Sequence, residues 1–194
     1  EASALQALVD CAPRYARALQ AVHSEVQAPG STANLVVEER LAGSGTTDFG
    51  APAMAPEADE APIDGEELGR LDAVLKASWL TFEKAVSAAE GMALRKGPRG
   101  GGRDLAAIVK HVVEANEAYL RKLAWRPSLD PGSAPTDQLG QIRGEVSMAL
   151  AAAAEGTLPS TGPRGGKLWT PRFFVRRAAW HLLDHAWEIE DRIL

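Results

Sequence analysis

The chain has 194 residues, a mass of 20.6 kDa and a formal net charge of -5, from 21 Lys and Arg against 26 Asp and Glu. This balance argues against a dedicated nucleic-acid binder, because neutralising phosphates needs a basic surface. No apolar run approaches the roughly 20 residues that a membrane-spanning helix requires, and the N-terminus shows no signal-peptide pattern. Cys11 has no second cysteine to pair with, so we expect a reduced, cytoplasmic protein.

The first third of the chain predicts a mixture of helix and extended chain. Alanine is abundant while Ile, Val and Thr are sparse, which favours helix. Residues 3–27 carry helical apolar stripes that Pro13 interrupts, so we expect a kink or two short helices there. Residues 35–37 predict a short extended segment with no strand to pair with. We therefore treat residues 1–45 as an N-terminal segment, and the start at Glu1 leaves open whether further residues precede it.

The next segment has the composition of a connector. Gly, Pro, Ala, Ser and Thr dominate from residue 43 to residue 62, and four acidic residues lie among them. We take residues 46–62 as a solvated acidic linker.

Residues 63–194 contain four segments with apolar residues at helical spacing. Asp64 with Glu67 forms a capping-box pattern, and the second segment starts near Asp104. The third starts at Thr136 after Pro135, and Thr170 is the N-cap residue of the fourth, with Pro171 at the first helical position. The apolar positions are Leu68, Leu71, Leu75, Trp79, Phe82 and Val86; Leu105, Ile108, Val112, Ala115 and Tyr119; Leu139, Ile142, Val146, Ala149 and Ala153; and Val175, Ala179, Leu182, Ala186, Ile189 and Ile193. Four amphipathic helices with no strand pattern among them predict an all-α four-helix bundle.

A short motif occurs twice. Gly-Pro-Arg-Gly-Gly spans residues 97–101 before the second helix and residues 162–166 before the fourth. It is either a shared helix-breaking sequence or the sign of a pseudo-twofold pair of helical hairpins.

Three of the four histidines lie beside the predicted core. His181 and His185 are spaced i, i+4, so their rings leave one face of the fourth helix about one turn apart. His111 borders the apolar stripe of the second helix. Three histidines with a water in the remaining position form an open, reactive metal site, although hydrogen-bonded core histidines are the alternative. No Glu-x-x-His pair occurs on these helices, which argues against a ferritin-like di-metal site.

The helix order and these motifs resemble a known family. Ile-Val-Lys-His-Val-Val-Glu-Ala around His111 and His181-Leu-Leu-Asp-His185, over residues 63–194, are similar to the DinB-like (YfiT-like) bundles. The resemblance implies an up-down-down-up four-helix bundle in which His111, His181 and His185 bind one divalent metal ion, zinc or nickel. It also implies a small-molecule substrate and a low-molecular-weight thiol such as bacillithiol or mycothiol. The first 62 residues then form a family-specific extension, loosely similar to a HicB-like module without its opening strands.

The sequence departs from the family after His185. Many members have another histidine there, whereas Ala186-Trp187-Glu188 follows here, so the substrate is not inherited and no catalytic residue is assigned. Glu188 could orient His185 from i+3 or be a surface carboxylate, and the same alternatives hold for Glu114.

These features lead to two hypotheses. The first is a metal-dependent transferase, isomerase or hydrolase, and the alternative is a non-catalytic metal-binding or interaction module. A nucleic-acid regulator is a third hypothesis, which the acidic charge disfavours; a homodimer stays open.

Cys11 is interpreted as a small packed hydrophobe outside the bundle. The remaining candidates are four arginines, carboxylate-binding or solvated, and two tryptophans, packed or walling a pocket: Arg99, Arg164, Arg176, Arg177, Trp180 and Trp187.

Overall fold

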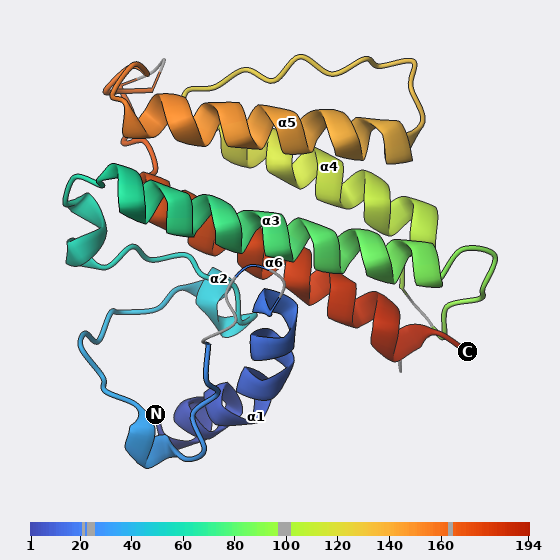
Figure 1. Cartoon of the computed structure of the whole chain (residues 1–194), viewed down its shortest axis with the longest axis horizontal. Helices are drawn as coiled ribbons and strands as arrows, with labels where there is room; N and C mark the ends of the chain where they lie inside the picture. The colour runs from blue at the N-terminus through green and yellow to red at the C-terminus, as the bar shows by residue number, and fades with distance from the viewer. Residues whose placement is uncertain (21, 23–25, 97–101, 163–164) are drawn as a thin grey trace.

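The computed structural model describes the chain except for residues 21, 23–25, 97–101 and 163–164 (Figure 1). The described part is all-helical and contains no strand, apart from an isolated antiparallel bridge between Leu94 and Ile193. None of its helices combines the length and apolar character needed to cross a membrane. In chain order the elements are α1 (Ala2–Leu19), η1 (Thr32–Asn34), α2 (Gly45–Asp48), η2 (Glu57–Glu60), α3 (Gly65–Ala88), α4 (Leu105–Arg121), α5 (Pro135–Ala154) and α6 (Pro171–Arg192).

The four long helices α3 to α6 lie along one another. In Figure 1, α3 and α6 run in one direction, and α4 and α5 run in the other. The segment between α4 and α5 returns along the length of the helices before α5 begins. The most extensive contacts join α3 to α6 and α4 to α5, and α4 also packs against α6. This last contact brings the histidine-bearing helices together.

The core follows the predicted apolar stripes. Phe82, Ile108, Ile142, Leu182 and Ile189 are each fully buried, one or more from every long helix. Burying a side chain of this size contributes about 1.5–3 kcal/mol relative to leaving it exposed. The stripes therefore supply the packing that holds α4 and α6 at a fixed distance.

The predicted helix starts at Asp64, Asp104 and Thr170 are confirmed, and each of these residues is an N-cap. The Asp64 side chain accepts a hydrogen bond from the Glu67 amide at 2.7 Å, and that of Asp104 accepts one from the Ala107 amide at 2.8 Å. Thr170 caps α6 in the same way. The capping box at Asp64 is incomplete, because the Glu67 carboxylate pairs with Arg172 on α6 instead. A guanidinium with two parallel donors binds a carboxylate more strongly than one backbone amide does.

The N-terminal segment differs from its prediction. α1 ends at Leu19 rather than continuing to residue 27. Pro13 lies within this helix, and Figure 1 shows its two halves running in different directions, as the predicted kink requires. Residues 35–37 agree with the predicted unpaired extended segment, since they lie outside any helix or strand, Leu35 has an extended backbone, and Val36 is 85% exposed. The prediction of a packed Cys11 is wrong, since this cysteine is exposed on α1.

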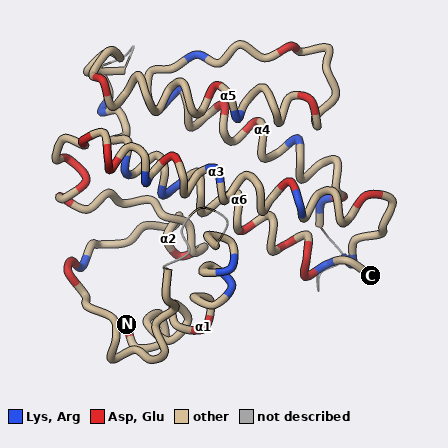
Figure 2. Tube along the Cα trace, viewed as in Figure 1, with Lys and Arg blue, Asp and Glu red and all other residues tan. Residues whose placement is uncertain are grey.

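The acidic segment between α2 and α3 is held against α6 rather than fully solvated. Ala51 and Asp59 are buried, and Asp59 pairs with Arg176 through both carboxylate oxygens, at 2.6 and 2.9 Å. Arg172 donates to the carbonyl of Pro62 at 3.1 Å, and Arg177 donates to that of Pro52 at 2.9 Å. Figure 2 shows the acidic positions of η2 beside basic positions at the start of α6. We call residues 51–62 the strap.

The predictions made from the repeated Gly-Pro-Arg-Gly-Gly motif concern residues that the structure does not describe. Residues 97–101 and 163–164 lie outside the described part of the chain. The predicted pair of hairpins and the predicted roles of Arg99 and Arg164 therefore stay predictions.

Candidate metal centre

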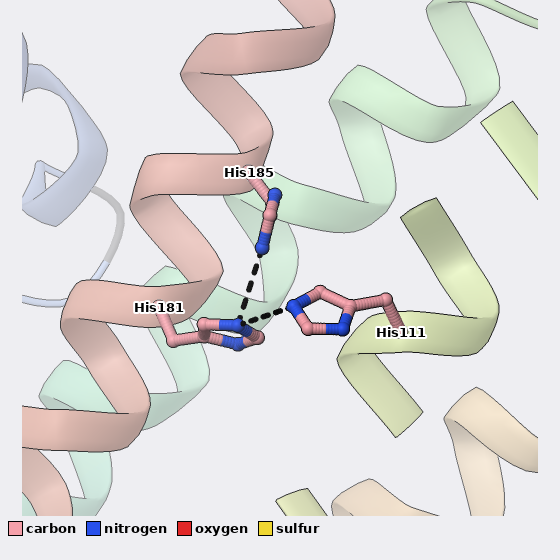
Figure 3. A group of neighbouring side chains, drawn as sticks. All are labelled: His111, His181 and His185. Atoms are coloured by element: carbon pink, nitrogen blue, oxygen red, sulfur yellow. Dashed lines mark hydrogen bonds between the residues drawn. The ribbon is translucent and has the colours of Figure 1, made fainter. Parts of the chain in front are cut away.

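The three histidines predicted from the sequence meet between α4 and α6. His111 extends from α4, and His181 and His185 extend from successive turns of α6, as Figure 3 shows. The Nε2 atom of His181 lies 3.2 Å from Nε2 of His111 and 3.2 Å from Nε2 of His185. One ring nitrogen from each residue falls within 4.8 Å of the other two. The spacing motif on α6 and the single histidine on α4 are therefore one cluster.

The spacing of the nitrogens fits a divalent ion. With metal–nitrogen bonds of about 2.0–2.1 Å, two ligands at a tetrahedral angle lie about 3.3–3.4 Å apart. Ligands at a right angle on the same ion lie about 2.9 Å apart. The two separations of 3.2 Å fall between these values. Each of these two pairs is therefore spaced for a shared ion, and the ligand atoms of His111 and His185 lie within 4.8 Å of each other.

The rings are kept neutral, as metal ligation requires. His181 is 5% exposed, and burial, with the neighbouring His185 second, lowers its pKa to about 3. Burial also lowers the pKa of His111, and Arg103 adds to this effect. Near neutral pH both rings therefore carry lone pairs that can bind a metal.

Glu188 fixes the orientation of His185. Its Oε2 lies 2.8 Å from Nδ1 of His185, while its other oxygen pairs with Arg192. Nδ1 donates this hydrogen bond, so Nε2 of His185 presents its lone pair to the other two rings. Arg192 is itself held, because it donates to the carbonyls of Arg95 and Arg103 at 2.8 Å each. The prediction of Glu188 as a surface carboxylate is wrong, and the orienting role is the one that the contacts support.

The hydrogen-bonding capacity of His181 cannot satisfy both of its neighbours. In a neutral imidazole, Nε2 carries either one hydrogen or one lone pair, so Nε2 of His181 can form a full hydrogen bond with only one of the two neighbouring rings. Its second nitrogen, Nδ1, is buried with no hydrogen-bond partner among the described residues. A cation at the meeting point of the three Nε2 atoms removes this conflict.

Aromatic and cationic side chains border the cluster. Tyr119 packs edge-on against His181 with ring centroids 5.7 Å apart. Arg177, one turn before His181 on α6, lies 4.9 Å from the ring centroid of Trp180 and 5.6 Å from that of Tyr119. Trp180 is partly buried and packs near His181, with ring centroids 6.0 Å apart. It also lines a cavity between α1 and α6, which matches the predicted alternative of a pocket wall, but none of the three histidines lines that cavity.

The other predicted candidates lie away from the cluster. Glu114 is exposed and pairs with Lys110 at 3.7 Å, so it does not orient His111. Trp187 stacks under Arg14 and, with Trp180 and Cys11, lines an apolar cavity of about 600 Å³ between α1 and α6. Arg176 points into its ion pair with Asp59. No sequence signal singled out Tyr119 as a neighbour of the histidines; its place on the core stripe predicted packing alone.

Comparisons with known proteins give no relative for this chain. No protein-family model, curated protein or solved structure matches it. Any function must therefore be argued from the geometry of the site.

Proposed function

We propose that this protein is a metal-dependent enzyme that binds one divalent ion, zinc or nickel, through His111, His181 and His185. The observation that carries the proposal is the convergence of three Nε2 atoms at metal-ligand spacing. The chain would act on a small molecule as a transferase, isomerase or hydrolase, with a low-molecular-weight thiol as a candidate cosubstrate.

The fold supports this proposal. The directions of α3 to α6 in Figure 1 agree with an up-down-down-up four-helix bundle, the arrangement implied by the resemblance to the DinB-like family. The three histidines also occupy the same helices, in the same order, as the resemblance implies. We therefore assign residues 63–194 to a DinB-like bundle and residues 1–62 to an extension that packs on α6.

The donor set suits Lewis-acid chemistry. Three neutral imidazoles leave the full charge of a divalent ion in place, and such an ion lowers the pKa of a water or thiol that reaches it. The residues of the chain prepare this site by burying His181, by aligning His185 through Glu188, and by leaving His111 partly exposed toward solvent. With three protein ligands, further positions stay open for a substrate.

The proposal is tested by the metal content of untagged protein. We expect about one zinc or nickel ion per chain after purification in metal-containing medium, measured by plasma mass spectrometry. His181→Ala should lose the ion. Leu182→Ala is the matched control: it removes a fully buried neighbour at an expected cost of about 2–5 kcal/mol of folding stability, and leucine has no atom that binds a metal.

Two outcomes decide the matter. Stoichiometric metal in the wild type and in Leu182→Ala, with none in His181→Ala, supports the proposed centre. Metal-free wild-type protein that also fails to bind added zinc or nickel contradicts it. If metal binds and the protein shows no turnover of thiol-dependent or hydrolytic test substrates, the alternative of a non-catalytic metal-binding module replaces the enzyme.

A further inference from the structure

We infer that the substrate of this centre carries a carboxylate, and that Arg177 binds this carboxylate beside the metal. The inference rests on the proposed metal site and names the substrate class for it. Arg177 is thereby distinguished from the other arginines at the start of α6.

The position of Arg177 is the first observation. It lies four residues before His181, and His185 follows four residues later, so the three side chains leave α6 along one stripe. Its guanidinium is held between Trp180 and Tyr119, and Tyr119 packs against the His181 ring.

The second observation is that Arg177 has unused donors. Arg172 and Arg176 pair with Glu67 and Asp59, whereas Arg177 pairs with no carboxylate among the described residues. One of its donors binds the Pro52 carbonyl at 2.9 Å. A guanidinium has five N–H donors, so a pair of parallel donors stays available for a planar carboxylate.

The charge around the cluster points to the same class of ligand. Three neutral histidines add no negative charge to balance a divalent ion, and Arg177 adds a positive charge over Tyr119, which packs against His181. Glu188 is committed to His185 and Arg192, and Glu114 pairs with Lys110. The site therefore has an excess of positive charge that an anionic ligand neutralises.

The strap explains why Arg177 keeps this position. The Pro52 carbonyl accepts a hydrogen bond from one side of the guanidinium, and the guanidinium carbon lies over the rings of Trp180 and Tyr119. Orienting the guanidinium before binding reduces the entropy lost when the ligand binds. The N-terminal extension thus contributes to the site through the main chain of residue 52.

The test uses full-length protein loaded with Co²⁺, whose visible absorption reports ligand binding. The probe is malonate, which can place one carboxylate on the metal and the other on Arg177. We expect Arg177→Gln to weaken malonate binding about 10- to 100-fold, the range for a charged hydrogen bond. Arg177→Lys, which keeps the charge but loses the paired donors, should show an intermediate loss. Arg121→Gln, the same change on an exposed part of α4, is the control and should bind as the wild type does.

The outcomes separate this inference from the proposed function. Wild-type affinity for malonate in either Arg177→Gln or Arg177→Lys, or no malonate binding by Co²⁺-loaded wild type, overturns the role of Arg177 and leaves the metal site standing. Failure of the wild type to take up Co²⁺ contradicts the metal site itself, and the inference falls with it. Thiocyanate binds metals but has no carboxylate, so its affinity should fall less than that of malonate in Arg177→Gln. An equal fall for both ligands would mean that Arg177 acts only through its charge, and it would overturn carboxylate recognition.

Discussion

Glu188→Gln tests whether the hydrogen bond to His185 prepares the metal site. The carboxylate lies 2.8 Å from Nδ1 of His185, and it is partly buried with 29% of its side chain exposed. Replacing it by the amide removes the negative charge that fixes the ring tautomer and strengthens the imidazole as a ligand. Partners of this kind are worth about 10- to 100-fold in metal affinity, or about 1.4–2.7 kcal/mol.

The assay is a competition titration of Zn²⁺ against a chromophoric chelator. We expect the Kd of Glu188→Gln to rise by that factor while the stoichiometry stays at one ion. A second readout is thermal unfolding. Zinc at about 100 times the wild-type Kd stabilises the wild type by about 2.7 kcal/mol, and a tenfold weaker variant gains about half as much.

Glu114→Gln is the matched control. It makes the same change of charge on α4, one turn from His111, but Glu114 is exposed and contacts Lys110 rather than a histidine. Its Kd should match that of the wild type within about twofold. An unchanged Kd in Glu188→Gln refutes the orienting role, and equal losses in both variants show a long-range charge effect in place of a hydrogen bond.

Three further predictions concern stability. In metal-free protein, the low pKa of His181 means that the unfolded chain binds a proton there below about pH 6.5 while the folded chain does not. Lowering the pH from 7.5 to 5.5 should therefore cost about 1.4 kcal/mol at this residue in urea unfolding. His181→Gln should reduce the acid loss by about that amount, the lowered pKa of His111 accounting for part of the rest, and an unchanged slope in that variant contradicts the assignment. Arg176→Met leaves the buried Asp59 without its partner and should lower the free energy of unfolding by about 1–3 kcal/mol. A loss below about 0.5 kcal/mol would mean that this ion pair does not anchor the strap. Asp104→Ala removes the N-cap of α4 and should lower the free energy of unfolding by about 1 kcal/mol, measured by chemical denaturation. Asp130→Ala is the control, because Asp130 is not a helix N-cap, and equal losses in the two variants would contradict the capping role of Asp104.

The sequence predicts the site well where spacing within one helix decides the geometry. His181 and His185 share a face because four residues make about one turn, and the core stripe beside His111 turns that ring toward α6. The sequence places Glu188 at i+3 from His185. Whether its carboxylate contacts His185 or lies in solvent depends on the position of Arg192, which the sequence does not give. The position of Arg192 depends in turn on the main-chain carbonyls of Arg95 and Arg103, which lie in the segment before α4.

Contacts between distant segments were less accessible to sequence reasoning. The composition of residues 43–62 indicates a linker, but Asp59 is buried because Arg176 lies opposite it more than a hundred residues later. The signal in the sequence was the acidic run in the linker together with the basic run at the start of the last helix. Periodicity alone also extended α1 beyond Leu19, because an apolar stripe does not mark where helical hydrogen bonding ends.

The central claim is that one ion lies among the three Nε2 atoms, and anomalous diffraction tests it most directly. Crystals grown with Zn²⁺ should give, in data collected on either side of the zinc absorption edge, a single anomalous peak about 2.0–2.1 Å from Nε2 of His111, His181 and His185. A loaded crystal whose zinc peaks all lie elsewhere, or whose histidine cluster shows no anomalous peak, would contradict the proposed centre.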